Sequence, residues 1–295
     1  MSGRSSRCFH IILFVAGLLV LSIPSWPGST DGSFDVQGHR GCRGLFPENT
    51  MPAFRAALEL GVTTLELDLQ VTRDRVLVVH HDQKLDSSRC VHDDGSPVSS
   101  TAIKKLDYSD LADIDCGRRP DGKFPERQTV TGARIPRLEE ILTLARDAAY
   151  PVRLSIEIKL QRAAHAIPLD EFAELFVKTV REFGLEERTI VQSFRPEALR
   201  AVGELAPNIE LAILVRRSSA YDQAIADSGA TILSPRFDGL QQADVERFRK
   251  RGIAVIPWTV NKPESIRRMI DWDVDGIISD YPDRVLEILS EREAQ

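Results

Sequence analysis

The chain has 295 residues, of which 42% are hydrophobic and 28% are charged, and its formal net charge is -6. This composition is that of an ordinary globular protein with apolar residues for one large core or two small ones. The negative charge and the lack of a long Lys/Arg run argue against nucleic acid as a partner, so any phosphate chemistry must be local.

Residues 1–30 resemble an export signal. Arg4 and Arg7 precede an uncharged apolar run at 11–23, which Pro24 and Pro27 follow. The run has the length of a signal core and is shorter than the roughly 20 residues of a membrane-spanning helix. Because no Ala-x-Ala cleavage site follows, an uncleaved membrane anchor is the alternative. Either reading places residues 31–295 outside the cytoplasm, in a periplasmic or extracellular space.

The four cysteines fit an oxidising compartment. Cys8 would leave with the signal, and Cys42, Cys90 and Cys116 would remain. Cys90 and Cys116 share a loop-rich segment, where a disulfide would stabilise a structure that lacks a large core of its own. We therefore predict a Cys90–Cys116 disulfide and a free Cys42. The alternative is that Cys90 and Cys116 are two unpaired small residues.

After residue 30, short β-branched or apolar runs alternate with amphipathic helical stretches, as in repeated strand-helix units. The eight predicted strands are residues 34–38, 64–70, 152–158, 189–193, 211–215, 231–234, 254–259 and 276–279. The predicted helices that follow them are residues 52–60, 137–148, 169–183, 196–205, 220–228, 243–250, 263–270 and 283–291. Eight such pairs in about 250 residues predict an α/β fold, a (β/α)8 TIM barrel. An open doubly wound sheet is the second choice.

A further strand-like run at 75–80 is too close to the second strand for a parallel crossover. It should fold back as a hairpin and bring His81 beside Asp68. Residues 83–135, rich in Asp, Ser, Gly and Pro, then form an insertion between the second strand and its helix. No separate second domain is expected.

Carboxylates concentrate at the ends of the second and third predicted strands. Glu66 and Asp68 are two residues apart, so both side chains point to the inner face of the barrel. Glu157 and Lys159 repeat this spacing on the neighbouring strand. Three converging carboxylates suit a hard divalent cation, Ca²⁺ or Mg²⁺, better than zinc. The alternative is a buried ion-pair network of these four side chains with Arg40.

Two histidines lie beside the carboxylates. His39 ends the first predicted strand and His81 ends the hairpin, so each could exchange a proton on one side of a bound phosphate. Arg40 offers a planar donor to a phosphate, and Lys159 offers a point charge. Strand alternation turns His80 away from His81, which indicates a structural role for His80.

The motifs at these positions resemble the glycerophosphodiester phosphodiesterase family. The matching segments are Gly38-His39-Arg40-Gly41, Pro47-Glu48-Asn49-Thr50, Glu66-Leu67-Asp68-Leu69-Gln70-Val71-Thr72-Arg73-Asp74, His81-Asp82, Ile156-Glu157-Ile158-Lys159, Gln192-Ser193-Phe194, Trp258-Thr259-Val260-Asn261 and Gly276-Ile277-Ile278-Ser279-Asp280-Tyr281-Pro282. Each segment alone is weak, but their order and spacing cover nearly all of the chain after the signal.

The resemblance implies a TIM barrel that hydrolyses glycerophosphodiesters, a small-molecule substrate class, to sn-glycerol 3-phosphate and an alcohol. It implies that a glycerol hydroxyl attacks phosphorus and that water opens the resulting cyclic phosphate. The residues that match family positions are the acid/base pair His39 and His81, the metal ligands Glu66, Asp68 and Glu157, and the phosphate contacts Arg40 and Lys159. Two further matching segments contribute Gln192 and Trp258 as candidate substrate contacts. Trp258 is a candidate wall for the glycerol, or else part of the barrel core.

Three alternatives stay open at this point. One is a phospholipase D of the sphingomyelinase type, with similar side chains on the same fold but acting on membrane lipids that keep both chains. The second is a catalytically silent protein that only captures phosphodiesters. The third is a purely structural surface protein, which would leave the inward carboxylates unexplained.

Overall fold

A computed structural model describes residues 34–159 and 167–294. The predicted export signal therefore lies outside the described residues. Within them, no helix is long and apolar enough to cross a membrane.

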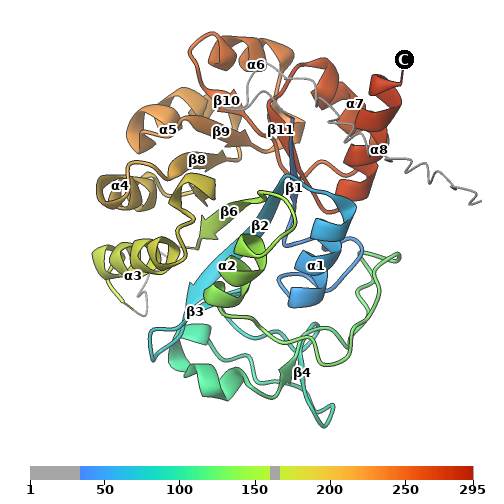
Figure 1. Cartoon of the computed structure of the whole chain (residues 1–295), viewed down its shortest axis with the longest axis vertical. Coiled ribbons are helices and arrows are strands. Elements are labelled where there is room, and N and C mark those ends of the chain that lie inside the picture. The colour runs from blue at the N-terminus through green and yellow to red at the C-terminus, as the bar shows by residue number, and fades with distance from the viewer. Residues whose placement is uncertain (1–33, 160–166, 295) are drawn as a thin grey trace, which may run out of the picture.

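Eight parallel strands form the centre of the described chain (Figure 1). They are β1 (Asp35–Gly38), β2 (Thr64–Val71), β6 (Arg153–Ile158), β7 (Thr189–Ser193), β8 (Glu210–Val215), β9 (Ile232–Pro235), β10 (Ala254–Val255) and β11 (Gly276–Ser279). Their order in the sheet is β10-β9-β8-β7-β6-β2-β1-β11, so strands adjacent along the chain are adjacent in space. In a doubly wound sheet, the order of the strands would instead reverse at an internal strand.

Backbone hydrogen bonds join the two ends of this sheet. Asp275 N donates to Val255 O, and Ile278 N donates to Pro257 O, both at 3.0 Å. Val260 N donates back to Ile278 O at 3.0 Å. The sheet is thus closed between β10 and β11, which confirms the predicted TIM barrel and excludes the open sheet.

In the described part of the chain, eight α-helices surround the strands (Figure 1). They are α1 (Met51–Leu60), α2 (Leu138–Arg146), α3 (Leu169–Glu182), α4 (Pro196–Leu205), α5 (Tyr221–Ser228), α6 (Gln242–Arg249), α7 (Pro263–Asp271) and α8 (Pro282–Glu293). Short 3-10 turns are η1 (Ile103–Lys105), η2 (Tyr108–Leu111), η3 (Glu186–Arg188), η4 (Ser218–Ala220) and η5 (Phe237–Gly239). The α-helices match the predicted ones to within a few residues at each end.

The seventh barrel strand is shorter than expected. The prediction extended it over 254–259, whereas β10 ends at Val255. Pro257 has no backbone N–H to donate, and a proline inside a sheet removes a ladder bond. The segment after β10 instead makes single contacts, including Trp258 N to Pro235 O at 3.0 Å. Its side chains still line the mouth of the barrel.

The strand β3 (Leu77–Val79) folds back antiparallel to β2, as the short connection required. Leu69 lies opposite Val79, and His80 N donates to Asp68 O at 2.9 Å. This hairpin carries His81 to the end of β2 that bears Asp68. A long insertion follows the hairpin, before α2.

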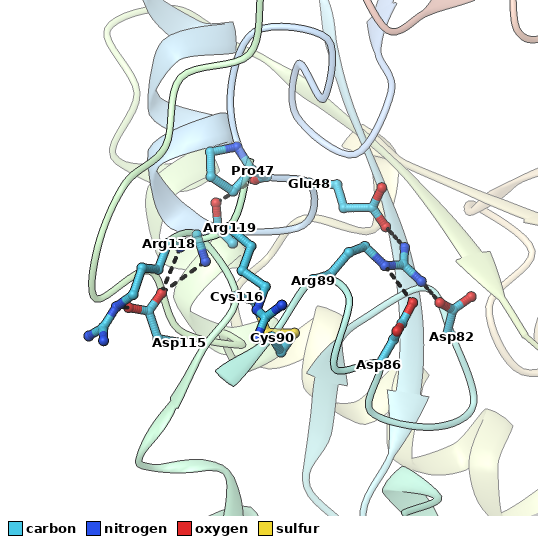
Figure 2. Close-up of a disulfide and its surroundings, with 12 residues drawn as sticks. Pro47, Glu48, Asp82, Asp86, Arg89, Cys90, Asp115, Cys116, Arg118 and Arg119 are labelled. Carbon is cyan, nitrogen blue, oxygen red and sulfur yellow. Dashed lines mark hydrogen bonds and ion pairs between the residues drawn. A yellow bond between two sulfur atoms is a disulfide. The ribbon is translucent and has the colours of Figure 1, made fainter. Parts of the chain in front are cut away.

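The segment between β3 and α2 has a small core of its own. It contains the two-stranded sheet of β4 (Val91–His92) and β5 (Ile114–Asp115), and its buried side chains include Leu85, Val98 and Ile103. A disulfide joins Cys90 to Cys116 within this segment (Figure 2). The bridge joins residues 26 apart and supplements this small core by restricting the unfolded segment.

Candidate active site

Along β2, alternate side chains point to the hydrophobic core and to the candidate site. Leu65, Leu67 and Leu69 are buried in the layer between the barrel and its helices, whereas Glu66 and Asp68 face the opposite way. On β6, Glu157 is the direct Cα partner of Asp68. The structure thereby brings the three predicted carboxylates together, with one oxygen of each within 4.8 Å of the others.

Two predicted phosphate contacts already pair with this cluster. Lys159 Nζ lies 3.0 Å from Asp68 Oδ1 and 2.6 Å from Glu157 Oε2. Arg40 Nε lies 3.1 Å from Asp68 Oδ2. Burial alone would raise the pKa of Asp68, but Lys159 and Arg40 outweigh it and hold that pKa well below its usual range. Asp68 is therefore a carboxylate in the folded protein.

Glu66 is different, because no lysine or arginine side-chain nitrogen among the described residues lies within 4.0 Å of its carboxylate oxygens. It accepts hydrogen bonds from Gln192 Nε2 at 2.6 Å and from Arg40 N at 2.8 Å. Burial and the charge of Asp68 raise the pKa of Glu66 well above its usual range. Burial also raises the pKa of Glu157 despite Lys159. Lys159 and Arg40 do not fully balance the three carboxylates, and the oxygen donor set fits a hard divalent cation.

The turn after β1 places the Arg40 amide beside Glu66. Arg40 has φ 53° and Gly41 has φ 86°. A Cβ on Gly41 would lie 2.7 Å from the Ala53 backbone, so this position requires glycine. Gly41 N also donates to Glu66 O at 3.1 Å, which ties the turn to β2.

His39 is held between two carboxylates. Its Nδ1 lies 2.5 Å from Asp280 Oδ1, and its Nε2 lies 3.9 Å from Glu66 Oε2. Burial lowers the pKa of His39 to about 4, although Asp280 acts in the opposite direction. The ring is therefore neutral near pH 7. With Nδ1–H donating a hydrogen bond to the Asp280 carboxylate, Nε2 is a proton acceptor that faces the carboxylate cluster.

His81 is more open to solvent: 30% of its side chain is exposed, against 12% for His39. Its Nδ1 lies 2.7 Å from Asp82 Oδ1, so a neighbouring carboxylate orients this ring too. Burial, with Arg40 and Lys159, lowers the pKa of His81 to about 4. An anionic phosphodiester bound beside the ring would shift its pKa upward.

A cavity of about 190 Å³ joins these groups. His39, Glu66, His81 and Glu157 are among the polar residues that line it. Phe194, Leu214 and Trp258 form an apolar wall. Two larger cavities, of about 590 and 470 Å³, also reach His81, so this histidine lies where a small inner space meets wider outer ones.

Gln192 and Trp258 occupy less direct positions. The Gln192 amide donates to Glu66, so it orients a carboxylate in addition to lining the cavity. The Trp258 indole donates to Ser234 O at 2.9 Å and packs edge-on against Phe194, with ring centroids 5.5 Å apart. Trp258 is thus a fixed wall of the cavity and also packs on the interior of the barrel.

Several residues of the site were not assigned a role from the sequence. Asp280 directly follows β11 and accepts hydrogen bonds from His39, from Arg43 Nε at 2.7 Å and from Asn261 Nδ2 at 2.7 Å. Asn49 donates to Asp68 Oδ2 at 2.8 Å. The rule that directs attention to the carboxyl ends of barrel strands would have found Asp280. No spacing rule points to Asn49, which lies in a loop.

Glu48 forms ion pairs with three arginines at the edge of the site. Its carboxylate lies 2.8 Å from Arg40 Nη1, 2.7 Å from Arg89 Nη1 and 3.6 Å from Arg43 Nη1. Burial alone would raise the pKa of Glu48, but the three guanidinium groups outweigh it and lower the pKa to about 2. Glu48 therefore stays ionised through the whole ordinary pH range.

We expect Glu48→Gln to lower the free energy of unfolding by about 3 kcal/mol near neutral pH, the equivalent of this pKa shift. A depressed folded-state pKa stabilises above the ordinary value of 4.5 and loses that contribution as the pH falls toward about 2. Urea unfolding of both proteins at neutral and acidic pH checks this. Glu204→Gln, on exposed α4 surface, is the control. A difference that does not shrink on acidification contradicts the prediction.

The free thiol is shielded. Cys42 is fully buried and donates to Ala53 O at 3.3 Å. Burial raises the pKa of its thiol to about 12, so little reactive thiolate is present. His80 is also buried, as its structural assignment required, and burial lowers its pKa to about 4.

Comparison with known proteins decides the family. The model of the glycerophosphoryl diester phosphodiesterase family matches residues 39–284. The chain belongs to this family. The matched region runs from His39 into the first turn of α8 and includes every residue of the cavity. The family predicted from the sequence motifs is confirmed, and with it the class of enzyme.

Individual relatives agree. A glycerophosphodiester phosphodiesterase of Caldanaerobacter subterraneus is 33% identical over 255 residues, which are 86% of this chain and 97% of the relative. The crystal structure of a putative glycerophosphoryl diester phosphodiesterase from Silicibacter pomeroyi has a TM-score of 0.83 at 31% identity, covering 88% of this chain and 94% of that one. A phosphodiesterase of Oleispira antarctica, solved with the product sn-glycerol-3-phosphate, has a TM-score of 0.73 at 21% identity over 87% and 96% of the two chains.

Proposed function

We propose that this chain hydrolyses glycerophosphodiesters to sn-glycerol 3-phosphate and an alcohol, with a divalent cation and a pair of histidines. The observation that carries the proposal is the cavity in which His39 and His81, each oriented by a carboxylate at Nδ1, lie beside three buried carboxylates. The product bound to the Oleispira antarctica phosphodiesterase supports the choice of sn-glycerol 3-phosphate.

Glu66, Asp68 and Glu157 would hold the cation, because their oxygens converge and Glu66 lacks a cationic partner among the described residues. A bound Ca²⁺ or Mg²⁺ would supply Lewis acid chemistry to a phosphate oxygen. Arg40 and Lys159 line the same cavity and add positive charge for the phosphate. Trp258 and Leu214 provide apolar surface for the carbon atoms of the glycerol.

His39 is the better candidate for the general base. Its Nε2 faces the carboxylate cluster, and Asp280 stabilises the charge that the ring gains on taking the proton of the glycerol hydroxyl. His81 borders the wider cavities, where a leaving alcohol has room, so it is the candidate acid. Attack of the hydroxyl on phosphorus then gives a cyclic phosphate, which water opens with the two roles reversed.

Export is part of the same proposal. The Cys90–Cys116 disulfide and the apolar leader support a periplasmic or extracellular site of action. Expression of the full chain with its own leader, followed by N-terminal sequencing of the exported protein, tests this. A protein that stays in the cytoplasm would overturn it.

Turnover of purified protein tests the proposed reaction. We expect release of sn-glycerol 3-phosphate from a panel of deacylated substrates that includes glycerophosphocholine, glycerophosphoethanolamine and glycerophosphoglycerol. Sphingomyelin and diacyl phosphatidylcholine are the comparison. Turnover of the lipids alone would support the sphingomyelinase-type phospholipase D instead. Tight binding without product would support a phosphodiester-binding protein.

A further inference from the structure

We propose that Arg89, in the segment between β3 and α2, is a positioning residue for the reaction, acting on His81 and Arg40 through two carboxylates. The inference rests on the proposed function, since it assigns a purpose to a residue that does not line the inner cavity. Figure 2 shows Arg89 between Asp82, Asp86 and Glu48, close to the Cys90–Cys116 disulfide.

The first connection leads to His81. The Arg89 guanidinium forms an ion pair with Asp82 through Nη2. Asp82 Oδ1 in turn lies 2.7 Å from His81 Nδ1. Asp82 is one-third exposed, and an exposed side chain with one partner would sample several rotamers. The arginine therefore restricts the carboxylate that sets the plane and the tautomer of the His81 ring.

The second connection leads to the other side of the cavity. Arg89 Nη1 lies 2.7 Å from Glu48 Oε1, the same oxygen that lies 2.8 Å from Arg40 Nη1. Glu48 is largely buried, so the two arginines share one fixed acceptor. Arg40 Nε in turn contacts Asp68 of the carboxylate cluster. One guanidinium thus contacts the partners of both His81 and Arg40.

The backbone and side chain of Arg89 are fixed by contacts within its own segment. Arg89 N and Cys90 N both donate to Asp86 O, at 3.0 and 2.8 Å, and Arg89 Nε lies 3.4 Å from Asp86 Oδ2. The next residue, Cys90, is bonded to Cys116. Beyond that bridge, the buried Asp115 carboxylate accepts hydrogen bonds from Gly117 N and Gly132 N, at 2.9 and 2.8 Å. The disulfide therefore fixes the backbone from which Arg89 reaches the site.

The test compares Arg89→Met, which keeps much of the side chain and removes its charge, with Arg89→Lys and Asp82→Asn. Arg134→Met is the matched control, because Arg134 lies in the same segment and pairs with Asp93 at 2.7 Å, away from the cavity. We expect Arg89→Met to lower kcat on glycerophosphodiesters by about 10- to 100-fold, as for groups that orient site residues from behind, with KM changed less than about threefold.

Two further results are expected. Arg89→Lys should recover part of kcat, because an ammonium can keep one of the two connections. The loss in the double variant Asp82→Asn, Arg89→Met should be smaller than the product of the two single losses, since both act on His81. The proposal is overturned if kcat of Arg89→Met stays within about twofold of Arg134→Met, or if the two losses multiply.

A readout without turnover separates this proposal from the reaction itself. The ¹⁵N shifts of the His81 ring report its tautomer, and we expect them to change in Arg89→Met but not in Arg134→Met. Unchanged shifts overturn the inference even in an active enzyme. Wild-type protein that turns over no glycerophosphodiester contradicts the proposed function, and the ring shifts then still decide on Arg89. If Arg89→Met does not fold, Arg89→Lys carries both measurements, and wild-type kcat and shifts in it overturn the proposal.

Discussion

Replacing His39 or His81 by alanine is expected to lower kcat on a glycerophosphodiester by about 10²- to 10⁴-fold, the usual contribution of a general acid or base. Each ring is oriented at Nδ1 by its own carboxylate, Asp280 or Asp82, and reaches the same cavity. Neither variant should change substrate binding to the same extent, because Arg40 and Lys159 remain. Steady-state kinetics on purified proteins measure this.

The control is His92→Ala. His92 pairs with Asp113 at 2.8 Å in the segment between β3 and α2 and does not line the cavity. The kcat of His92→Ala should equal that of the wild type. Near-normal turnover in both the His39 and His81 variants would show that the acid/base pair is wrongly assigned.

A substrate with a nitrophenol leaving group distinguishes acid from base. Nitrophenolate leaves without protonation, so a variant that lacks only the general acid should regain much of its activity. We expect recovery in His81→Ala, because His81 borders the outer cavities, and none in His39→Ala, whose Nε2 faces the carboxylates. The opposite pattern would exchange the two roles.

Much of this arrangement follows from local periodicity. The period of two along β2 separates Leu65 and Leu67 from Glu66 and Asp68, which is enough to predict two inward carboxylates. The short link after β2 forces a hairpin, and the hairpin fixes the place of His81. Counting strand-helix pairs then predicts the barrel. These inferences need only neighbouring residues and one rule of topology.

The contacts between distant loops could not be inferred in this way. His39 meets Asp280 across 241 residues, and Arg89 meets Glu48 across 41. The His39 contact depends on the pairing of β1 with β11, which closes the barrel. The Arg89 contact depends on how a flexible arginine side chain settles among several carboxylates, which no spacing rule predicts. The predicted end of the seventh strand was also wrong. The apolar run continues to residue 259, but Pro257 cannot donate a ladder hydrogen bond, and β10 ends at Val255.

Treatment with EDTA is expected to lower kcat on the order of 10³-fold, and Ca²⁺ or Mg²⁺ should restore it. The reason is the charge of the cluster, because burial and Asp68 raise the pKa of Glu66. Among the described residues, the ionisable nitrogen that lies within 4.0 Å of the Glu66 carboxylate belongs to His39, which is neutral. A divalent cation supplies the charge that Lys159 and Arg40 leave unbalanced.

Binding and stability readouts make this prediction independent of turnover. Calorimetry should show one cation bound by the wild type and weak or no binding in Glu66→Gln and Asp68→Asn, with Glu204→Gln as the exposed control. The cation should also raise the melting temperature of the wild type, since it binds only the folded arrangement of the three carboxylates. If EDTA leaves the rate unchanged and calorimetry detects no binding, Glu66, Asp68 and Glu157 form a buried ion-pair network with Lys159 and Arg40.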